Sequence, residues 1–287
     1  MSKEVSDTMN LTEISRGLKL SNDGIWRSVD TEFISYPRDG NEACFALEDE
    51  SFWFLHRNQC IVSAIRHLPP TDGGAIFDIG GGNGFVARAI QTAGYQVVLV
   101  EPGHDGARNA KHRGLQTVIC STLRSARFIS QSLPAIGLFD VLEHIERDRE
   151  FLAELRDLLI DSGRLYLTVP AYQFLWSHSD ATAGHYRRYR LSQLQELLGN
   201  VGFEVKFSSY FFQPLVLPIF LGRTVPSFLR RLPKGPSKRR SKKEHNAGGD
   251  SSRQLLAKIL SAEPTRIAKG KPMSFGASCL VVATRTG

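Results

Sequence analysis

The sequence predicts an α/β protein with a mostly parallel β-sheet and helices on both of its faces. From residue 75 onward, short apolar runs alternate with segments of helical length, and strands separated by such helices form parallel sheets. A glycine-rich stretch at residues 80–84 (GGGNG) follows the first apolar run. Glycines between a strand and a helix let a ligand contact the backbone, so the sequence also predicts a binding site there.

The predicted elements follow one another closely along the chain. Residues 1–50 are polar and aperiodic, and we expect an N-terminal arm with little regular structure. Residues 51–68 place apolar side chains near one face of a helix, which Pro69-Pro70 ends. Further helices are predicted at 84–93, 104–112, 122–131, 148–160 and 191–200, and strands at 75–79, 96–100, 116–120, 136–141, 164–169, 204–208 and 278–285.

The last predicted strand is separated from the rest by an insertion. The domain is therefore expected to comprise residues 51–208 and 275–287, with residues 209–274 inserted. The chain has 36 Lys and Arg against 29 Asp and Glu, a net charge of +7. Residues 223–250 hold nine of these basic side chains and two acids, so the rest of the chain is balanced at 27 against 27. A neutral body argues against a nucleic-acid-binding protein, and the middle of the insertion, 233–252, is predicted to be flexible.

The spacing of the cysteines and the length of the apolar runs indicate the cellular compartment of the protein. Cys44, Cys60, Cys120 and Cys279 lie far apart, with no CxxC. This spacing predicts no disulfide framework and no metal site, and it fits a reducing compartment. Residues 1–17 lack the apolar core of a secretory signal, and no apolar run reaches the ~18–20 residues that span a bilayer. We expect a cytoplasmic protein.

The candidate ligand-binding residues follow the predicted strands, because ligands of open parallel sheets bind beyond the C-terminal ends of the strands. The first strand contains an acid and leads into four glycines: Asp78, then Gly80, Gly81, Gly82 and Gly84. Phe85 stands where a dinucleotide motif has its third glycine, which disfavours NAD and FAD. Glu101 ends the second strand, where a carboxylate accepts hydrogen bonds from both hydroxyls of a ribose.

A third motif, FDVLEHI at residues 139–145, follows the fourth predicted strand. Together with D-x-G-x-G-x-G at 78–84 and the acid that ends the second strand, it resembles the class I S-adenosylmethionine-dependent methyltransferases over residues 75–169. The resemblance implies a Rossmann-like seven-stranded sheet with helices on both faces. It also implies that the last strand, 278–285, is antiparallel and lies between the fifth and sixth, and that the cofactor is S-adenosylmethionine.

The same resemblance assigns roles to individual residues. The glycine loop would contact the amino-acid and ribose parts of the cofactor, Asp78 would orient that loop or the cofactor amine, and Glu101 would hold the ribose. Asp140 and Leu142 would line the methionine end. The acid that often binds adenine after the third strand is missing, so Ser121, or the next residue, is assigned to the adenine.

Residues 169–189 resemble a narrower bacterial subgroup with the signature V-P-A-x-x-x-L-W-S…D…G-H-x-R-R-Y. Members are often encoded among genes of cell-surface polysaccharide or lipid modification. The resemblance implies a small-molecule acceptor, or one linked to a lipid or sugar. Candidate substrate-binding residues are Trp53, Tyr172, Trp176, Arg187, Arg188 and Tyr189. The adjacent arginines fit either bidentate binding of an anion or an ion pair with Asp180 or Glu143 that holds the loop.

Two histidines are candidate general bases. A hydroxyl acceptor needs a base, and histidine is the commonest choice near neutral pH. His144 follows the fourth predicted strand and His185 the fifth. The alternative for His144 is a cap of the following helix, with Glu143 in the same role.

The insertion begins with an apolar stretch, residues 210–222, that Pro214 and Pro218 interrupt. It fits a wall of the substrate pocket or a subunit interface. Together with the basic residues up to 243 it also fits contact with an anionic membrane, at the inner membrane surface.

The sequence therefore predicts a methyltransferase, with O-methylation of a small-molecule or lipid- or sugar-linked acceptor in cell-envelope or secondary metabolism as the first hypothesis. One alternative is a quinol O-methyltransferase of ubiquinone biosynthesis, which shares the L-E-H stretch but lacks H-x-R-R-Y. A nucleic-acid methyltransferase is disfavoured, because residues 140–143 do not form [D/N/S]-P-P-[Y/F/W] and no Pro-Cys dipeptide exists. The remaining alternative is a non-catalytic cofactor-binding protein.

Overall fold

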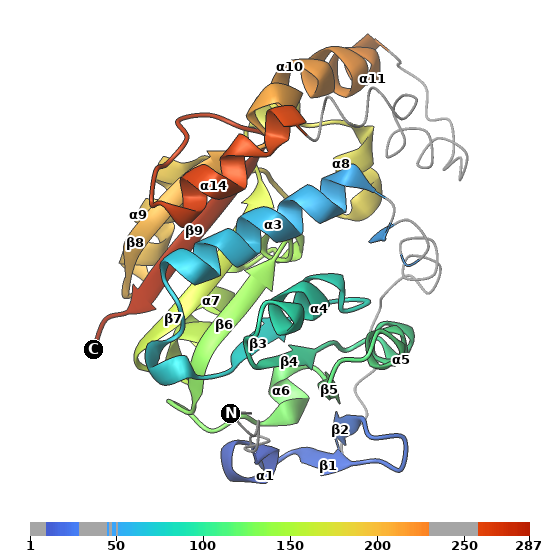
Figure 1. Ribbon diagram of the computed structural model, residues 1–287, viewed down its shortest axis with the longest axis vertical. Helices are drawn as coiled ribbons and strands as arrows, with labels where there is room; N and C mark the ends of the chain where they lie inside the picture. The colour runs from blue at the N-terminus through green and yellow to red at the C-terminus, as the bar shows by residue number, and fades with distance from the viewer. Residues whose placement is uncertain (1–9, 29–44, 46–47, 50, 230–257) are drawn as a thin grey trace.

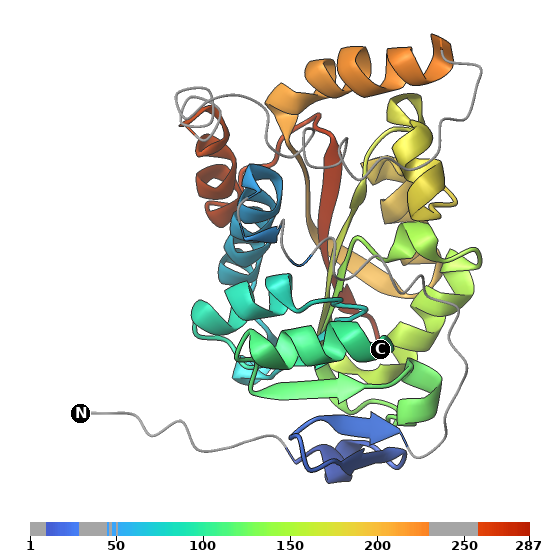
Figure 2. The same ribbon diagram turned by 90° about the vertical axis from the view of Figure 1, so that its right-hand side faces the viewer.

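The computed structural model describes residues 10–28, 45, 48–49, 51–229 and 258–287. These residues form one mixed sheet between two layers of helices (Figures 1 and 2). Its order in the described chain is β1-β2-β5-β4-β3-β6-β7-β9-β8. The strands are β1 (Leu18–Leu20), β2 (Trp26–Ser28), β3 (Ile76–Ile79), β4 (Val97–Val100), β5 (Thr117–Cys120), β6 (Leu133–Phe139), β7 (Leu159–Pro170), β8 (Phe203–Phe211) and β9 (Ser278–Arg285).

The sheet has nine strands rather than the predicted seven, because the N-terminal arm contributes β1 and β2. The two strands form a hairpin around Gly24, which has a φ of +73°. β2 lies parallel to β5, with Trp26 opposite Ile119 and Arg27 opposite Cys120. The prediction of an irregular arm was wrong here. Each strand is only three residues long, and Leu18 is the one buried residue of the six, so neither leaves an alternating pattern in the sequence.

The seven predicted strands form the rest of the sheet in the expected arrangement. Strands β3 to β7 run parallel to one another. β9 is antiparallel to both of its neighbours, β7 and β8, and lies between them. The last strand is therefore antiparallel, as predicted. Because β3 to β7 run parallel, the motifs that follow them lie at one edge of the sheet.

Helices cover both faces (Figure 2). One face packs against helices α3 (Phe52–His67), α4 (Phe85–Thr92), α5 (His104–His112) and α14 (Ala262–Ala268). The other face packs against α1 (Leu11–Ile14), α6 (Leu123–Ala126), α7 (Asp148–Leu158) and α9 (Leu191–Asn200). Two separate apolar cores result, one on each side of the sheet.

The helix predicted at 122–131 is only four residues long. Arg127 adopts a left-handed φ of +48°, which ends α6. The next residues pair with the N-terminal arm, since Ser15 and Phe128 form a bridge and the Ile129 N–H donates to the Ile14 carbonyl over 2.8 Å. Tertiary pairing with the unforeseen arm replaces the predicted second half of the helix.

The insertion starts with a run of short helices at one end of the molecule (Figure 1). These are η4 (Gln213–Leu215), α10 (Val216–Ile219), η5 (Phe220–Thr224) and α11 (Val225–Leu229). The run is fixed to the segment after β7, because the Thr224 hydroxyl donates to the Leu175 carbonyl and Ser227 accepts from the His178 N–H. The flexible basic stretch predicted at 233–252 lies outside the described residues. Within the described part, no helix is both long and apolar enough to cross a membrane.

Candidate functional site

The glycine loop joins β3 to α4 and leaves an open cradle. Gly80, Gly82 and Gly84 all have positive φ, at +71°, +55° and +76°, which glycine adopts without steric cost. A Cβ on Gly81 would lie 2.3 Å from Leu99 Cδ1, so this position requires glycine. A Cβ on Gly82 would meet nothing within 4 Å. The loop therefore presents bare backbone to open space.

Asp78 lies in β3 beneath this loop. Its side chain is fully buried, and both carboxylate oxygens lack a hydrogen-bond partner in the structure. Burial raises the pKa of Asp78 to about 7, while the positive charge of Arg57 opposes the rise. A buried carboxylate without a partner is costly, and an ammonium group of a ligand would supply one. The site thus fits the amine of S-adenosylmethionine.

Glu101 follows β4 and connects the glycine loop to the next loop. Its Oε2 accepts from the Gly82 N–H over 2.9 Å, and its Oε1 accepts from the Gly103 N–H over 2.7 Å. Burial raises the pKa of Glu101, and these two N–H groups oppose the rise. Each carboxylate oxygen has a further lone pair, so the fixed carboxylate remains suited to the two hydroxyls of a ribose.

Asp140 marks the end of β6 and forms an ion pair with α3 across the C-terminal edge of β3 to β6, the region that we call the crevice. It adopts a φ of +56°, and its Oδ1 accepts from the Thr168 hydroxyl over 3.1 Å. Arg57 Nη1 in α3 donates to Asp140 Oδ2 over 2.7 Å. Burial raises the pKa of both Asp78 and Glu143, and the positive charge of Arg57 opposes that rise. Arg57 is therefore a cation that three acids of this crevice share.

Arg57 was not predicted as a site residue, although the sequence contains a signal for it. It lies three residues after Phe54 and four before Ile61, within the predicted apolar face of helix 51–68. A charge in such a face needs a buried partner, and Asp140 is that partner.

Leu142 and Ser121 lie at the expected strand ends. Leu142 is fully buried in η2 (Leu142–His144), directly after β6. Ser121 is buried after β5, and its hydroxyl donates to the Thr122 carbonyl over 2.9 Å. The predicted cofactor residues therefore meet at the C-terminal edge of β3, β4, β5 and β6. Their contacts with the cofactor stay predictions.

A clamp that the sequence did not reveal ties the segment before α3 to the glycine loop. Arg113 forms ion pairs with Glu48 over 2.8 Å and Asp49 over 2.7 Å. Its guanidinium lies 4.4 Å from the centre of the Phe45 ring. Glu48 also accepts from Asn83 of the glycine loop over 3.4 Å. The acids come from the aperiodic arm, which carries no pattern that would identify them.

The two predicted catalytic histidines lie together beyond the C-terminal end of β6. The rings of His144 and His185 meet edge to face, with centroids 4.7 Å apart. Partial desolvation, followed by the neighbouring His185, lowers the pKa of His144. His185 Nδ1 lies 3.1 Å from Asp180 Oδ1. The adjacent Glu143 is buried, its Oε2 has no partner, and burial together with Asp140 raises its pKa well above the usual range.

The arginines of the H-x-R-R-Y block are paired with acids. Arg188 binds Asp180 through Nε and Nη2, over 2.7 and 3.1 Å. Arg187 pairs with Asp148 over 2.6 Å, and the Tyr189 hydroxyl donates to the same carboxylate over 2.9 Å. Arg188 therefore forms the ion pair with Asp180 that was the alternative to anion binding. Arg187 is also in an ion pair, but with Asp148, which was not predicted. All three residues line a surface groove of about 630 Å³ beside α9.

Two of the three aromatic residues predicted to bind the substrate outside the H-x-R-R-Y block, Trp53 and Tyr172, stack on other rings of the protein. Trp53 stacks on Phe212, with centroids 3.9 Å apart. Tyr172 has a φ of +57° and stacks on Tyr210 at 4.9 Å. Trp176 is half-buried after η3 (Gln173–Leu175). Nothing in these contacts tests a role in substrate binding, which stays a prediction for all three.

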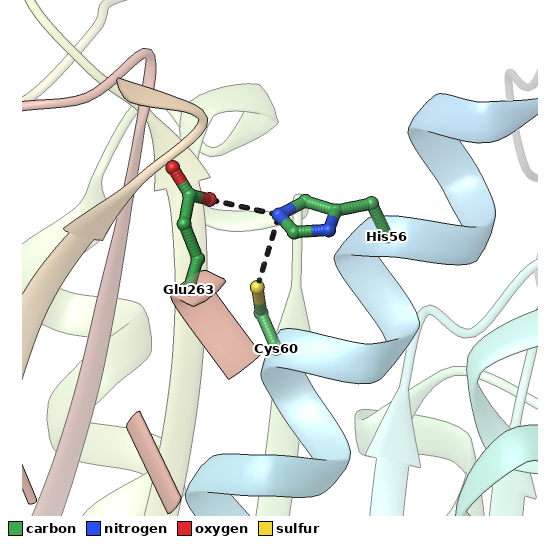
Figure 3. A group of neighbouring side chains, drawn as sticks. All are labelled: His56, Cys60 and Glu263. Carbon is green, nitrogen blue, oxygen red and sulfur yellow. Dashed lines mark hydrogen bonds and ion pairs between the residues drawn. The ribbon is translucent and has the colours of Figure 1, made fainter. Parts of the chain in front are cut away.

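A second cluster lies inside the molecule, between α3 and α14 (Figure 3). His56 Nε2 is 2.8 Å from Glu263 Oε2 and 3.4 Å from Cys60 Sγ. The Phe212 and Gln213 N–H groups donate to Oε2 and Oε1 of Glu263, each over 2.8 Å. We call His56, Cys60 and Glu263 the latch, because they join α3 to α14 and to the chain after β8. The sequence reasoning did not predict it.

The fold and the cofactor crevice define a class I S-adenosylmethionine-dependent methyltransferase. A family model described as a methyltransferase domain matches residues 54–206, which is more than half of the chain. The chain therefore belongs to this methyltransferase family. It is an enzyme that uses S-adenosylmethionine.

Solved structures share the fold at low sequence identity. One is a chain of the complex between the Haloferax volcanii Trm112 methyltransferase activator and a methyltransferase. It has a TM-score of 0.56 and 13% identity, with 87% of this chain and 97% of that chain covered. Another is Haemonchus contortus phosphoethanolamine N-methyltransferase 2 with S-adenosylmethionine, at 0.53 and 18%, covering 88% of this chain and 58% of that one. A search of curated proteins finds no match.

Proposed function

We propose that the enzyme methylates an oxygen of a small-molecule, lipid-linked or sugar-linked acceptor in cell-envelope or secondary metabolism. The observation that carries this proposal is the pair of imidazoles, His144 and His185, at the methionine end beside Asp140. A hydroxyl must lose its proton when it accepts a methyl group, and paired histidines provide proton acceptors near neutral pH. The resemblance of residues 169–189 to the subgroup with the H-x-R-R-Y signature supports the class of acceptor.

S-adenosylmethionine supplies the electrophilic methyl group, and the chain positions it. Asp78 holds the cofactor amine, Glu101 holds the ribose hydroxyls, and Ser121 faces the adenine. Leu142 and Asp140 border the methionine end, where Arg57 neutralises Asp140. Fixed groups of this kind hold donor and acceptor in line, which is the main contribution of a protein to methyl transfer.

His185 is the better-oriented of the two proton acceptors. Asp180 is ionised, because hydrogen bonds from His185 and Arg188 lower its pKa despite its burial. It accepts from His185 Nδ1, which leaves Nε2 as the free lone pair. The lowered pKa of His144 favours the neutral form of that ring, which can then accept a proton.

A lipid-linked acceptor agrees with the surface of the insertion. Leu217 and Leu221 are 64% and 56% exposed, one helical turn apart, and Phe174 beside Phe220 is 50% exposed. An apolar outer face is unusual for a surface helix. The nine basic residues between 223 and 243 follow it in the sequence. We propose that this face rests on an anionic membrane surface. Because the short helices contact the segment after β7, the membrane would then lie close to the proposed acceptor site.

The test is incorporation of labelled methyl groups from S-adenosylmethionine into cell-envelope extracts. We expect labelled products in the lipid or glycan fraction with the intact enzyme, and much less label with Glu101→Gln when S-adenosylmethionine is below saturation. Label in a quinol fraction would favour the ubiquinone-type alternative, and label in nucleic acid would replace the proposal. Cofactor binding without label in any fraction would favour a non-catalytic role.

A further inference from the structure

Three potential ligands for a metal ion meet at the acceptor end of the crevice. A carboxylate oxygen of Glu143 and ring nitrogens of His144 and His185 all lie within 4.8 Å of one another. Ligand atoms around a tetrahedral zinc ion are about 3.3 Å apart, so the three atoms here are at most about 1.5 Å farther apart than in such a site. The segments are also held together by the main chain, because the Tyr186 N–H donates to the Glu143 carbonyl over 2.8 Å.

The hydrogen bonding of His185 prepares it as a ligand. Its Nδ1 faces Asp180, which also binds Arg188 and accepts from the Ser177 N–H over 2.8 Å. This acid accepts hydrogen bonds from three residues and is fixed, so His185 carries its proton on Nδ1 and keeps the lone pair of Nε2 for a ligand. Histidines that bind metals almost always donate their other N–H to a carboxylate, carbonyl or water in this way.

Glu143 lacks the partner that a buried carboxylate needs. Only 1% of the residue is exposed, and Oε2 has no hydrogen-bond partner in the described structure. The cost of such an unpaired group is large. The described positive charges that act on it are Arg57 and Arg188. Arg57 donates to Asp140, and Arg188 donates to Asp180 and to the Ala171 carbonyl, so the described hydrogen bonds of neither guanidinium reach Glu143.

We propose that Glu143, His144 and His185 bind a divalent metal ion. Two imidazoles and one carboxylate suit zinc, cobalt or another first-row transition ion rather than magnesium or calcium. His144 is exposed, so the remaining coordination positions face the solvent side and are open to an exogenous ligand. Three protein ligands with an open position are the arrangement of catalytic rather than structural metal sites.

Binding of the metal ion does not depend on the proposed function, but its chemical role rests on that function, the methylation of an oxygen. With the metal bound, the way in which the acceptor hydroxyl is activated changes. A metal ion that takes an acceptor hydroxyl as a ligand lowers the pKa of that hydroxyl. The hydroxyl proton then leaves to solvent, and the oxygen forms its new bond to the methyl carbon as the carbon–sulfur bond breaks. With their lone pairs on the metal, His144 and His185 are ligands and not general bases.

The latch does not carry the same inference, although it also combines a histidine with a carboxylate. Both oxygens of Glu263 already accept main-chain N–H groups, and one also faces His56. All three latch residues are buried. No coordination position remains open there for an exogenous ligand.

The test is calorimetric titration of the full chain with zinc chloride, after treatment with a chelator and its removal, in the absence of S-adenosylmethionine. We expect one zinc ion per chain. His144→Gln and His185→Gln should each weaken binding by at least about tenfold, since even outer partners of metal ligands contribute 10–100-fold. His178→Gln removes an exposed histidine from the same loop region and should bind like the wild type. Far-ultraviolet circular dichroism checks that each variant is folded.

Three results would overturn the proposal: no zinc binding, binding that both histidine variants retain, or binding that Cys60→Ser abolishes, which places the ion in the latch. The cobalt complex adds an independent readout, because a thiolate charge-transfer band would show a cysteine ligand and so place the ion outside the proposed site. Zinc binding without methyl transfer rejects only the proposed reaction. Methyl transfer without zinc binding rejects only the metal site and leaves the histidine pair as bases.

Discussion

The latch and the cluster of Glu143, His144 and His185 use the same residue types in opposite ways. In the latch, the buried Glu263 has main-chain donors on both oxygens and an imidazole beside it. In the crevice, the equally buried Glu143 has an oxygen with no partner. Burial alone therefore does not define a functional site. In this pair, Glu263 has donors on both oxygens and stabilises the fold, whereas the oxygen of Glu143 that has no partner is available to a ligand.

The largest expected effect is a difference in the free energy of unfolding between two variants, Glu263→Gln and Glu143→Gln. Glu263→Gln should destabilise the fold by about 3–5 kcal/mol, as the loss of one partner of a buried charged network usually does. Glu143→Gln should change stability little or raise it, because it removes an unpaired buried carboxylate. Urea denaturation measures both.

The control for this pair is Glu196→Gln, an exposed acid of α9, which should stay within about 0.5 kcal/mol of the wild type. Equal losses for Glu263→Gln and Glu143→Gln would contradict the contrast between the two clusters.

A second effect tests the other unsatisfied carboxylate, Asp78. Its pKa rises from 3.8 to about 7 on folding, so between these values the folded state binds more protons than the unfolded state. Stability should therefore fall as pH rises through this window, by up to about 1.4 kcal/mol per pH unit. Asp78→Asn should lose this slope. Unfolding free energies of both proteins from pH 5 to 7 measure it, and parallel curves would show that Asp78 is satisfied in solution.

The effect of Glu101 on cofactor binding should be smaller than these effects on stability. Its carboxylate keeps two main-chain donors and lone pairs for a ribose. Glu101→Gln exchanges an acceptor for a donor, and the affinity for S-adenosylmethionine should fall by about 2 kcal/mol, or about 30-fold. Calorimetry on the folded variant measures this. An unchanged affinity would remove Glu101 from the cofactor site.

The smallest effect is expected at Arg187. Its ion pair with Asp148 is partly exposed, at 32% and 17%, and such pairs contribute roughly 0–1 kcal/mol. Arg187→Gln should therefore alter stability and the Michaelis constant for the acceptor only slightly. A large rise in that Michaelis constant, with stability unchanged, would restore the alternative in which the arginine binds an anionic acceptor.

Much of the cofactor half was predictable because its residues are local in the sequence. Asp78 and the glycine loop are contiguous, and each later motif follows a strand whose apolar run is recognisable. The parallel order of the sheet then brings the motifs to one edge. The pairing of His144 with His185 was not predictable, since it depends on how the loop after β7 folds back against Glu143.

Long-range partners account for the residues that were missed. Arg57 and Asp140 are 83 positions apart, and His56 and Glu263 are 207 apart. The arm strands β1 and β2 form only because β5 offers an edge to pair with. In each case the sequence around the residue does not indicate which distant residue it will contact.

The sequence by itself determined the class of fold, the antiparallel last strand through its family resemblance, and the cofactor motifs. These follow from the apolar periodicity of the chain and from glycines at a turn where only glycine fits. Only the tertiary structure decided which charged groups are satisfied. A hydrogen bond or ion pair depends on distances between side chains from different elements, so Glu263 became part of the latch and Glu143 was left open to a ligand.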